Sequence, residues 1–434
     1  LQPASTKPRL VFVCSGHGSQ WLGMARSLLV GEPVFRTALE TIDREVEAIA
    51  HWSVIDELLA DNLRSRLERP EIVQVVIFAS QVALGTLWQA WGIEPDVIVG
   101  HSVGEIAAAH LAGILSLQDA VRVVVERGRV VGELAAGRGA MLLVALPEAM
   151  LLERLGEVGQ SLVVGAYNSP RSTVLSGSRQ AIEQAEGLLT QRGVRVRRVD
   201  IDFASHSPQM LPLIAPFEAA IASITPRPAR IPMYSTVMVE PLDGHECTPS
   251  YWGRNLRSPV RFRQVIDRLA DDGPTVFVEL SSHPTLLQAI EQTLDGVTGS
   301  FRVLPSCWRN EDERGSMLKT LAKLFDLGFD PEWLAVWAQA PKLEMQRPEL
   351  GERMSDATGD VEVGVWEVEN RYRVPLLLSA KTELALWAQA ERLRGYLLDH
   401  PNLALADVAH SLATTRAHFE RRASINARDL PDAL

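Results

Sequence analysis

The chain has 434 residues, of which 46% are apolar, and this is enough for buried cores in two or three domains. Its formal net charge is −11 and its basic residues are spread throughout, so electrostatics favour neither nucleic acid nor an anionic membrane as a partner. The histidines and the three cysteines lack metal-ligand or paired spacing, and we expect no metal site and buried thiols at Cys14, Cys247 and Cys307. The longest apolar stretches contain polar residues, which argues against a membrane span and for a cytoplasmic protein.

Strands and helices alternate in the first third of the chain. Residues 9–14 predict a buried strand, and the glycine-rich turn at 15–21 either cradles an anion or simply closes that strand. Amphipathic helices are predicted over 33–68, and a long apolar helix over 72–91 contains Gln74. With the elements that follow, this order predicts a parallel sheet covered by helices on both faces.

The next stretch has the pattern of a nucleophile elbow. A short strand at 97–99 runs into Gly100-His101-Ser102-Val103-Gly104, and a helix begins at once with Glu105. The glycines permit a turn tight enough to leave the Ser102 hydroxyl clear of the sheet, and the first N–H groups of the helix point toward it. A bare Gly-x-Ser-x-Gly arises by chance in about one chain in ten of this size. The strand before it and the helix after it therefore carry the prediction of a catalytic serine.

Residues 139–200 predict a separate subdomain inserted into the larger one. Its elements follow the β-α-β-β-α-β order of a ferredoxin-like fold. The predicted strands are 140–145, 161–166, 172–175 and 194–199, and the predicted helices are 148–157 and 180–191. Asn168 lies between the central strands, where it either faces the cleft between subdomains or serves the turn itself.

Two charged or titratable residues have both a functional and an ordinary interpretation. His206 lies in a loop at 200–210 among small residues and a proline, where the chain returns toward the elbow. A catalytic serine requires a base, although a lone histidine is more often a surface or core residue. Arg127, on a predicted helix at 117–134, either grips a carboxylate with two hydrogen bonds or is one more solvated charge.

The rest of the chain completes the sheet and adds a C-terminal region. Strands are predicted at 231–237 and 275–280, and the turn after the second, at 281–284, either buttresses the site or simply ends the strand. Further along are a helix at 317–327, a polar linker at 340–369, a strand at 375–379 and helices at 383–398 and 403–415. A chain that opens with Leu1 is expected to be one piece of a longer polypeptide. The expected divisions are a leader at 1–8, a large subdomain at 9–138 and 201–335, the insertion at 139–200, a linker at 336–371 and a C-terminal segment at 372–434.

Five stretches, taken in order, resemble the acyltransferase domain of modular type I polyketide synthases, a relative of the malonyl-CoA:acyl carrier protein transacylases. The likeness spans about residues 10–330, and its carriers are Ser15–Trp21, Gly100–Glu105, Arg127, Phe203–Gln209 and Val278–Pro284. The resemblance implies an α/β fold with an α/β-hydrolase-like parallel-sheet core and an inserted ferredoxin-like subdomain, in agreement with the pattern above. We expect a small α/β linker region to follow at the C-terminus.

The resemblance also implies a role for each matching residue. Ser102 would take an acyl group from coenzyme A, and His206 would be its base in a dyad without a third acid. Backbone N–H groups of His17 and Val103 would form the oxyanion hole, and Arg127 would pair with the free carboxylate of a malonyl-type substrate. The family usually has glutamine at the position of His17, so contacts around that side chain are a departure.

Two signals for acyl selectivity point in different directions. At the position of Phe203-Ala204-Ser205, members of the family that use methylmalonyl have Tyr-Ala-Ser, and members that use malonyl have His-Ala-Phe. Ser205 leaves room for an α-methyl branch that a phenylalanine would fill. Val103 is commoner in malonyl enzymes. A methyl group in a pocket is worth only about 1–3 kcal/mol, and we expect methylmalonyl first and malonyl next. Gln74 is assigned to the same pocket, and Asn168 and His283 to positions behind the site.

The C-terminal segment departs from the usual pattern of this family. Its stretches 375–381 and 407–416 resemble the linker that normally joins a ketosynthase to an acyltransferase. This implies a neighbouring ketosynthase and leads us to expect a second acyltransferase after the segment in the parent protein.

The expected activity is acyl transfer from an acyl-CoA to the phosphopantetheine thiol of an acyl carrier protein, with no bound cofactor. Three alternatives stay open. The domain would instead load a monocarboxylic starter unit, hydrolyse acyl thioesters with the same dyad, or be a degenerate scaffold.

Overall fold

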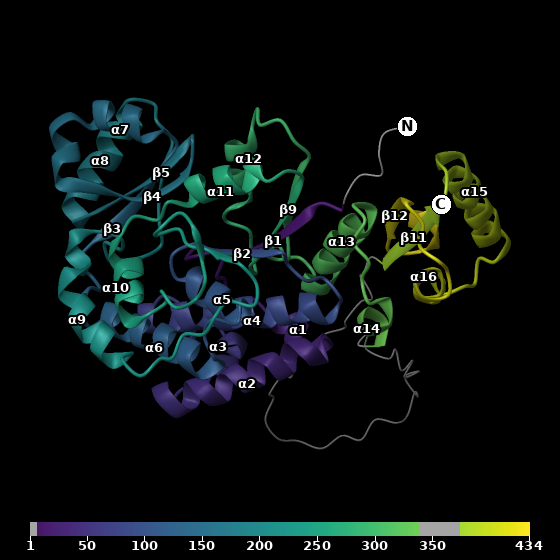
Figure 1. The fold of residues 1–434 in the computed structure, drawn as a ribbon, viewed down its shortest axis with the longest axis horizontal. Coiled ribbons are helices and arrows are strands. Elements are labelled where there is room, and N and C mark those ends of the chain that lie inside the picture. The colour runs from purple at the N-terminus through teal and green to yellow at the C-terminus, as the bar shows by residue number, and fades with distance from the viewer. Residues whose placement is uncertain (1–6, 339–373) are drawn as a thin grey trace, which may run out of the picture.

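The computed structural model describes residues 7–338 and 374–434. Figure 1 shows three parts along the longest axis: a small sheet with its helices at one end, a large helix-covered sheet in the middle, and a C-terminal unit at the other end. The predicted α/β class is confirmed. The three cysteines are free and buried, as expected.

The large sheet has six strands in the order β10-β9-β1-β2-β7-β8. The first five are parallel, and only the edge strand β8 is antiparallel to its neighbour. Their bounds are β1 (Arg9–Cys14), β2 (Val97–Gly100), β7 (Met233–Tyr234), β8 (Pro241–Leu242), β9 (Thr275–Leu280) and β10 (Phe301–Pro305). Because a parallel sheet is covered on both faces, its central strands are apolar at nearly every position.

Alternate residues of β1 enter two different cores. Leu10, Phe12 and Cys14 face one core, and Val11 and Val13 face the other, as the period of two in a strand requires. The first core holds α1 (Arg26–Gly31), α2 (Pro33–Ala50), α3 (Val54–Leu59), α4 (Pro70–Ala90), α5 (Gly104–Leu111), α6 (Leu117–Leu134), α9 (Leu211–Ala220), α10 (Pro249–Arg257), α13 (Glu313–Asp326) and α14 (Trp333–Ala338). The second core is covered by α11 (Phe262–Asp271) and α12 (Leu287–Leu294).

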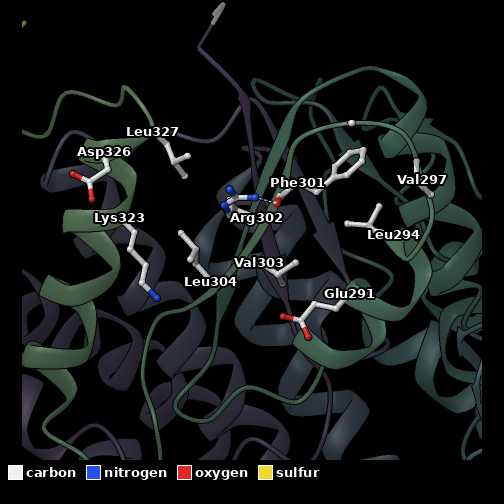
Figure 2. Close-up of a pocket in the computed structure, with 11 residues that line it drawn as sticks. Glu291, Leu294, Val297, Phe301, Arg302, Val303, Leu304, Lys323, Asp326 and Leu327 are labelled. Atoms are coloured by element: carbon white, nitrogen blue, oxygen red, sulfur yellow. Dashed lines mark hydrogen bonds between the residues drawn. The ribbon is translucent and has the colours of Figure 1, made fainter. Parts of the chain in front are cut away.

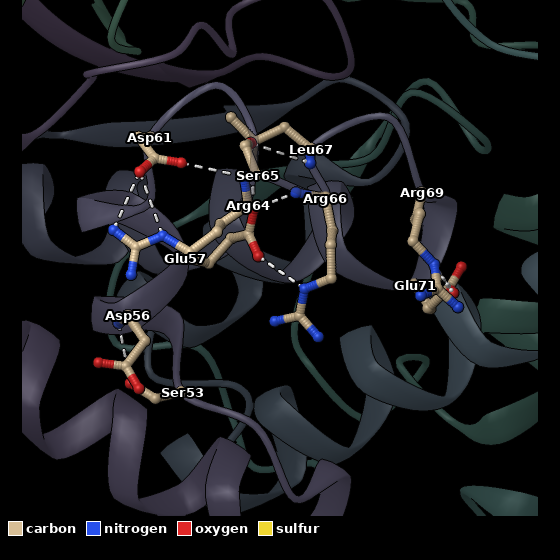
Figure 3. A network of polar contacts seen from close by, with 10 residues as sticks. All are labelled: Ser53, Asp56, Glu57, Asp61, Arg64, Ser65, Arg66, Leu67, Arg69 and Glu71. Atoms are coloured by element: carbon tan, nitrogen blue, oxygen red, sulfur yellow. Dashed lines mark hydrogen bonds and ion pairs between the residues drawn. The ribbon is translucent and has the colours of Figure 1, made fainter.

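Helix α4 is apolar on almost every side. By length and composition it is able to cross a membrane, so the expectation that no stretch qualifies is wrong, but 89% of its most apolar window is buried in this fold. A helix that is apolar all round belongs in a protein core. The loop before it is held by the buried carboxylate of Glu57, which accepts from the Arg66 backbone N–H at 2.5 Å and from the Arg66 guanidinium at 2.9 Å. Figure 3 shows this network and the Arg69–Glu71 ion pair beside it.

The inserted subdomain is a four-stranded antiparallel sheet in the order β4-β5-β3-β6, as a ferredoxin-like fold requires. Its elements are β3 (Ala140–Val144), α7 (Glu148–Leu155), the 3₁₀ turn η1 (Gly156–Ser161), β4 (Leu162–Ser169), β5 (Ser172–Gly177), α8 (Arg179–Gln191) and β6 (Val196–Arg198). The subdomain has a small core of its own. Backbone hydrogen bonds tie it to the large subdomain, from Tyr167 N–H to the Val260 carbonyl and from Val260 N–H to the Gly165 carbonyl, at 2.8 and 2.9 Å.

The C-terminal unit pairs two antiparallel strands and packs helices against them. Its elements are β11 (Val374–Ala380), α15 (Glu383–Asp399), α16 (Leu405–Thr414), β12 (Arg421–Ala427) and α17 (Leu430–Ala433). Arg422 attaches the unit to the large subdomain, because its guanidinium donates to the Phe329 carbonyl and pairs with Asp330, both at 2.8 Å. The predicted linker at 340–369 and most of the expected leader lie outside the described residues.

The strand predicted at 231–237 is shorter than expected and is reduced to β7. The backbone N–H of Thr236 donates to the Glu105 carboxylate at 2.6 Å instead of to a strand. The N–H of Ser235 turns back to the Glu240 carbonyl at 3.0 Å, which closes the connection to β8. A buried carboxylate has thus taken the place of a sheet partner.

Candidate active site

Ser102 occupies a sharp turn between β2 and α5. Its φ of 56° lies in the left-handed region, which L-residues adopt at a cost of about 1–2 kcal/mol. A Cβ at Gly100 would lie 2.3 Å from Glu105 Cα, and one at Gly104 would lie 2.2 Å from the Cys14 carbonyl oxygen. Both glycines are therefore required by close backbone approach. The predicted strand, turn and helix of the elbow are all present.

Ser102 and His206 lie together, although 104 residues separate them. Ser102 Oγ is 2.6 Å from His206 Nε2, and His206 Nδ1 is 2.9 Å from the Ser258 carbonyl oxygen. A carbonyl only accepts, so Nδ1 carries the ring hydrogen and Nε2 is left to accept the hydroxyl proton. His206 precedes the 3₁₀ turn η2 (Pro208–Met210) and, like Ser102, has a positive φ, of 58°.

The electrostatics of the site keep its imidazoles neutral. Burial lowers the pKa of His206 to about 3, and the positive charge of Arg127 adds to this shift. Burial also lowers the pKa of His17 to about 3, again helped by Arg127. At neutral pH both rings are therefore uncharged, and His206 is in the form that accepts a proton.

The two N–H groups predicted for an oxyanion hole lie on the turns that follow β1 and β2. Within residues 7–338 and 374–434, neither the His17 nor the Val103 N–H donates to another backbone group. A Cβ built on Gly16 would come within 3.6 Å of Ser102 Cβ, so the first turn passes directly over the nucleophile. Both donors are thus free to bind an oxygen that forms at the Ser102 site.

Arg127 reaches the nucleophile from α6, and Gln74 reaches Arg127 from α4. The Arg127 side chain is buried, and its terminal nitrogens contact the Gln74 amide oxygen and, at 3.4 Å, Ser102 Oγ. Burial lowers the pKa of its guanidinium to about 10, with the charge of Glu105 opposing the shift. Among the described residues, no carboxylate forms an ion pair with Arg127, so this buried cation is available to an anionic ligand.

The predicted selectivity residues at 203–205 are all buried. The rings of Phe203 and His17 meet edge to face, with centroids 6.0 Å apart. Ala204 and Ser205 are also buried, and the Ser205 carbonyl accepts from the Ser176 hydroxyl of the inserted subdomain at 2.6 Å. The His17 ring thus has an aromatic neighbour in Phe203.

The two residues assigned behind the site have different surroundings. Asn168 is at the end of β4, and its amide oxygen lies 2.8 Å from Nε2 of His101, the residue before the nucleophile, so it faces the large subdomain. His283 instead accepts from the Arg309 N–H at 3.3 Å and packs edge to face on Trp308. In the described part of the chain His283 makes no hydrogen bond to the dyad.

Several buried polar atoms of this site have no partner among the described residues. They are Nε2 of His17, Nε2 of Gln74, Nδ1 of His101 and Nε of Arg127. Buried polar atoms are satisfied in most native proteins, so a group of orphans around one serine marks a place prepared for a polar ligand. No group of three metal-ligating side chains is present in the described ranges.

Sequence reasoning missed the groups that hold the dyad in place. The Ser258 carbonyl that orients His206 is a backbone atom and leaves no mark in the residue types. Glu105 was expected at the start of a helix and in the Gly100–Glu105 stretch, with no role of its own, yet it is fully buried and accepts hydrogen bonds from Thr236, Tyr251 and Asn255. An acidic residue in an otherwise apolar helix, Glu105-Ile106-Ala107-Ala108-Ala109, was the signal available.

A separate cavity lies away from Ser102. It is a groove of about 670 Å³ between β10, α12 and α13, and Figure 2 shows its lining. Phe301, Val303, Leu327 and the charged Lys323 and Asp326 belong to this lining. None of the residues gathered around Ser102 contributes to it.

The whole chain was compared with known families and structures. A family profile described as the acyl transferase domain matches residues 11–331. The chain belongs to this family. A second profile, described as the CurL-like polyketide synthase C-terminal region, matches residues 375–434.

Relatives of this acyltransferase domain are polyketide synthases. Erythronolide synthase EryA2 of Saccharopolyspora erythraea is 40% identical over 326 residues, which is 75% of this chain but only 9% of that protein. The acyltransferase domain of module 8 of the salinomycin polyketide synthase superposes with a TM-score of 0.72 at 37% identity, covering 75% of this chain and 77% of that one. A loading acyltransferase of the avermectin synthase superposes with a TM-score of 0.70, also at 37% identity, over 73% and 99% of the two chains. The domain is a transferase of the polyketide synthase type.

Proposed function

We propose that this acyltransferase takes a methylmalonyl or, next in preference, a malonyl group from coenzyme A and passes it to the phosphopantetheine thiol of an acyl carrier protein. The observation that carries the proposal is the buried Arg127 guanidinium, which contacts the nucleophile oxygen and has no carboxylate partner in the described chain. A cation placed beside a nucleophile selects an acyl group that carries its own carboxylate.

The first half-reaction follows from the dyad geometry. Ser102 Oγ attacks the thioester carbonyl carbon while its proton passes to His206 Nε2, 2.6 Å away. The carbonyl oxygen becomes an oxyanion that accepts from the N–H groups of His17 and Val103. As the C–S bond breaks, the coenzyme A thiolate takes the proton back from Nε2, and a Ser102 ester remains.

The second half-reaction repeats these steps with a different thiol. The phosphopantetheine thiol gives its proton to His206 Nε2 and attacks the ester carbonyl, and Ser102 Oγ leaves with that proton. A substrate carboxylate on Arg127 offsets the charge that helps to depress the pKa of His206. The base is therefore strongest when the correct acyl group is bound.

The pocket wall supports methylmalonyl over malonyl. Ser205 is small and buried, and a phenylalanine at this position, as in malonyl enzymes of this family, would take the room that an α-methyl group needs. A methyl group changes binding by about 1–3 kcal/mol, so the expected preference is tens of fold and not absolute.

A starter-loading role is the second candidate. It is favoured by the avermectin loading acyltransferase, which is as similar in sequence to this chain as the salinomycin module 8 domain is. Arg127 argues against it, because a monocarboxylic acyl group leaves that buried cation unpaired. For the parent protein we propose an acyl carrier protein and a ketosynthase as partners in the same polypeptide, a second acyltransferase after this segment, and a cytoplasmic location.

The test is to expose the protein to a mixture of methylmalonyl-, malonyl-, propionyl- and acetyl-CoA and to measure the mass of the Ser102 adduct. We expect methylmalonyl to dominate and the adduct to pass to a phosphopantetheinylated carrier protein. A dominant propionyl or acetyl adduct would establish the loading role. Free acid without labelled carrier would identify a hydrolase, and no adduct with any thioester would indicate a scaffold.

A further inference from the structure

The buried carboxylate of Glu105 has no role in the steps above, yet it lies directly beneath the nucleophile turn. It accepts from the Thr236 N–H at 2.6 Å, the Thr236 hydroxyl at 2.5 Å, the Tyr251 hydroxyl and, at 3.0 Å, the Asn255 side-chain amide. All four donors come from segments more than 130 residues further along the chain. A buried carboxylate requires such donors, so their convergence is what allows Glu105 to stay inside.

Asn255 links this carboxylate to the nucleophile. Its side-chain nitrogen, which donates to Glu105, also lies 3.3 Å from the Ser102 carbonyl oxygen. The backbone N–H of Glu105 donates to the same carbonyl at 3.0 Å. Two donors from the Glu105–Asn255 pair therefore fix one peptide oxygen.

That peptide unit also contains the N–H of Val103. In a trans peptide the C=O and N–H point in opposite directions, so a carbonyl held from below directs the N–H toward the opposite side. In the described part of the chain the Val103 N–H has no backbone partner, and it is the donor assigned to the oxyanion. The Ser102 φ of 56° needs the same support, because the left-handed region is unfavourable for a residue with a side chain.

We propose that Glu105 and Asn255 are positioning residues that lock the Ser102–Val103 peptide, so that the Val103 N–H faces the oxyanion and Ser102 Oγ stays on His206. The identity of the acyl substrate rests on the proposed function, but the orientation of this peptide does not. The same orientation is needed for any electrophile that Ser102 attacks.

The test therefore uses a probe that does not depend on the acyl group. A fluorophosphonate reacts with activated serines, and its rate of addition to Ser102 is measured by intact-protein mass. We expect Asn255→Ala and Glu105→Gln each to slow labelling by about 10- to 100-fold, as loss of hydrogen bonds to a charged or buried group does. The double variant should be no slower than the slower single variant, because both act through one peptide. With methylmalonyl-CoA, kcat should fall and KM should stay within about twofold.

Glu313→Gln is the matched control. Glu313 is also a buried carboxylate, which accepts from the Ala25 N–H at 2.6 Å and the Ser27 hydroxyl at 2.7 Å, and it makes no hydrogen bond to the elbow. Its labelling rate should stay within about twofold of the parent. Thermal unfolding of each variant shows whether it is folded. If Glu105→Gln is not folded, Tyr251→Phe replaces it, because this variant removes one hydrogen-bond donor to Glu105.

Labelling of folded Asn255→Ala at the parent rate would overturn the proposal, and so would losses that multiply in the double variant. Failure of the proposed function has a different signature. In that case the parent protein would form no adduct with any acyl-CoA, while fluorophosphonate labelling would still depend on Asn255 and Glu105.

Discussion

The turn that carries Ser102 and the groove beside β10 differ in almost every respect. The groove is a hollow of about 670 Å³ along an edge strand, with apolar walls and the exposed charged side chains of Lys323 and Asp326. Among the described residues, the region around Ser102 holds buried polar atoms without partners, a guanidinium without a counter-ion, and two residues with positive φ. Unsatisfied polarity and backbone strain mark the region around Ser102 as the candidate active site.

The largest effect should come from removing the nucleophile. Ser102→Ala is expected to lower the acylation rate by about 10⁴-fold or more, because no other hydroxyl of the described chain bonds to His206 Nε2. Single-turnover acylation followed by intact mass is the measurement. An adduct that persists at the parent rate would move the chemistry to another residue.

Arg127→Ala should have the next largest effect. It should change the selectivity between acyl-CoA substrates more than the acylation rate. Removing a charged partner of a carboxylate is expected to reduce the preference for methylmalonyl-CoA over propionyl-CoA by about 10- to 100-fold. Competition between the two thioesters measures that ratio directly. Gln74→Ala is a useful companion, since it removes the neutral partner of Arg127 and leaves the charge. An unchanged ratio in Arg127→Ala would remove the basis for an extender unit.

The pH dependence should reveal the depressed pKa of the base. The reactive form of His206 is neutral, and with a pKa of about 3 instead of 6.5 it stays neutral as the pH falls. The fluorophosphonate rate at pH 5.5 should therefore be within about twofold of the rate at pH 8, whereas an ordinary histidine would lose about tenfold. In Arg127→Ala the inflection should move upward, because the second cause of the shift is gone. An inflection near 6.5 in the parent protein would contradict this electrostatic description.

The smallest effect is expected in the groove. Lys323→Ala and Val303→Ala should leave the acylation rate within about twofold, because neither side chain contacts any group of the dyad. The loss from Val303→Ala should be confined to about 1 kcal/mol of stability, measured by denaturant unfolding. A tenfold loss of activity in either variant would show that the groove is coupled to Ser102.

Much of the fold was accessible from local pattern. β1 and β9 and the helix α6 have the predicted bounds, because buried strands and capped amphipathic helices leave strong signals over short windows. The strand predicted at 231–237 is cut short, because the Thr236 amide hydrogen binds the Glu105 side chain, which is distant in sequence. Strand β10 was not predicted, since an edge strand with half-exposed residues has little contrast with a loop.

The candidate site divides in the same way. Ser102, His206 and Arg127 were found because motifs mark them, and the structure brings all three together. The Ser258 carbonyl and the Asn255 amide depend on three-dimensional convergence, which no spacing in the sequence encodes. Asn168 was assigned to the site, but the sequence left open whether its side chain would face the large subdomain.

The order in which the parts of the dyad occur along the chain also matters while the protein is being made. The base follows the nucleophile by 104 residues, and the carbonyl that orients the base follows by a further 52. During translation Ser102 therefore leaves the ribosome long before anything is present to activate it. The Ser102 hydroxyl therefore has no oriented histidine beside it until the segment after α10 has been synthesised and has docked.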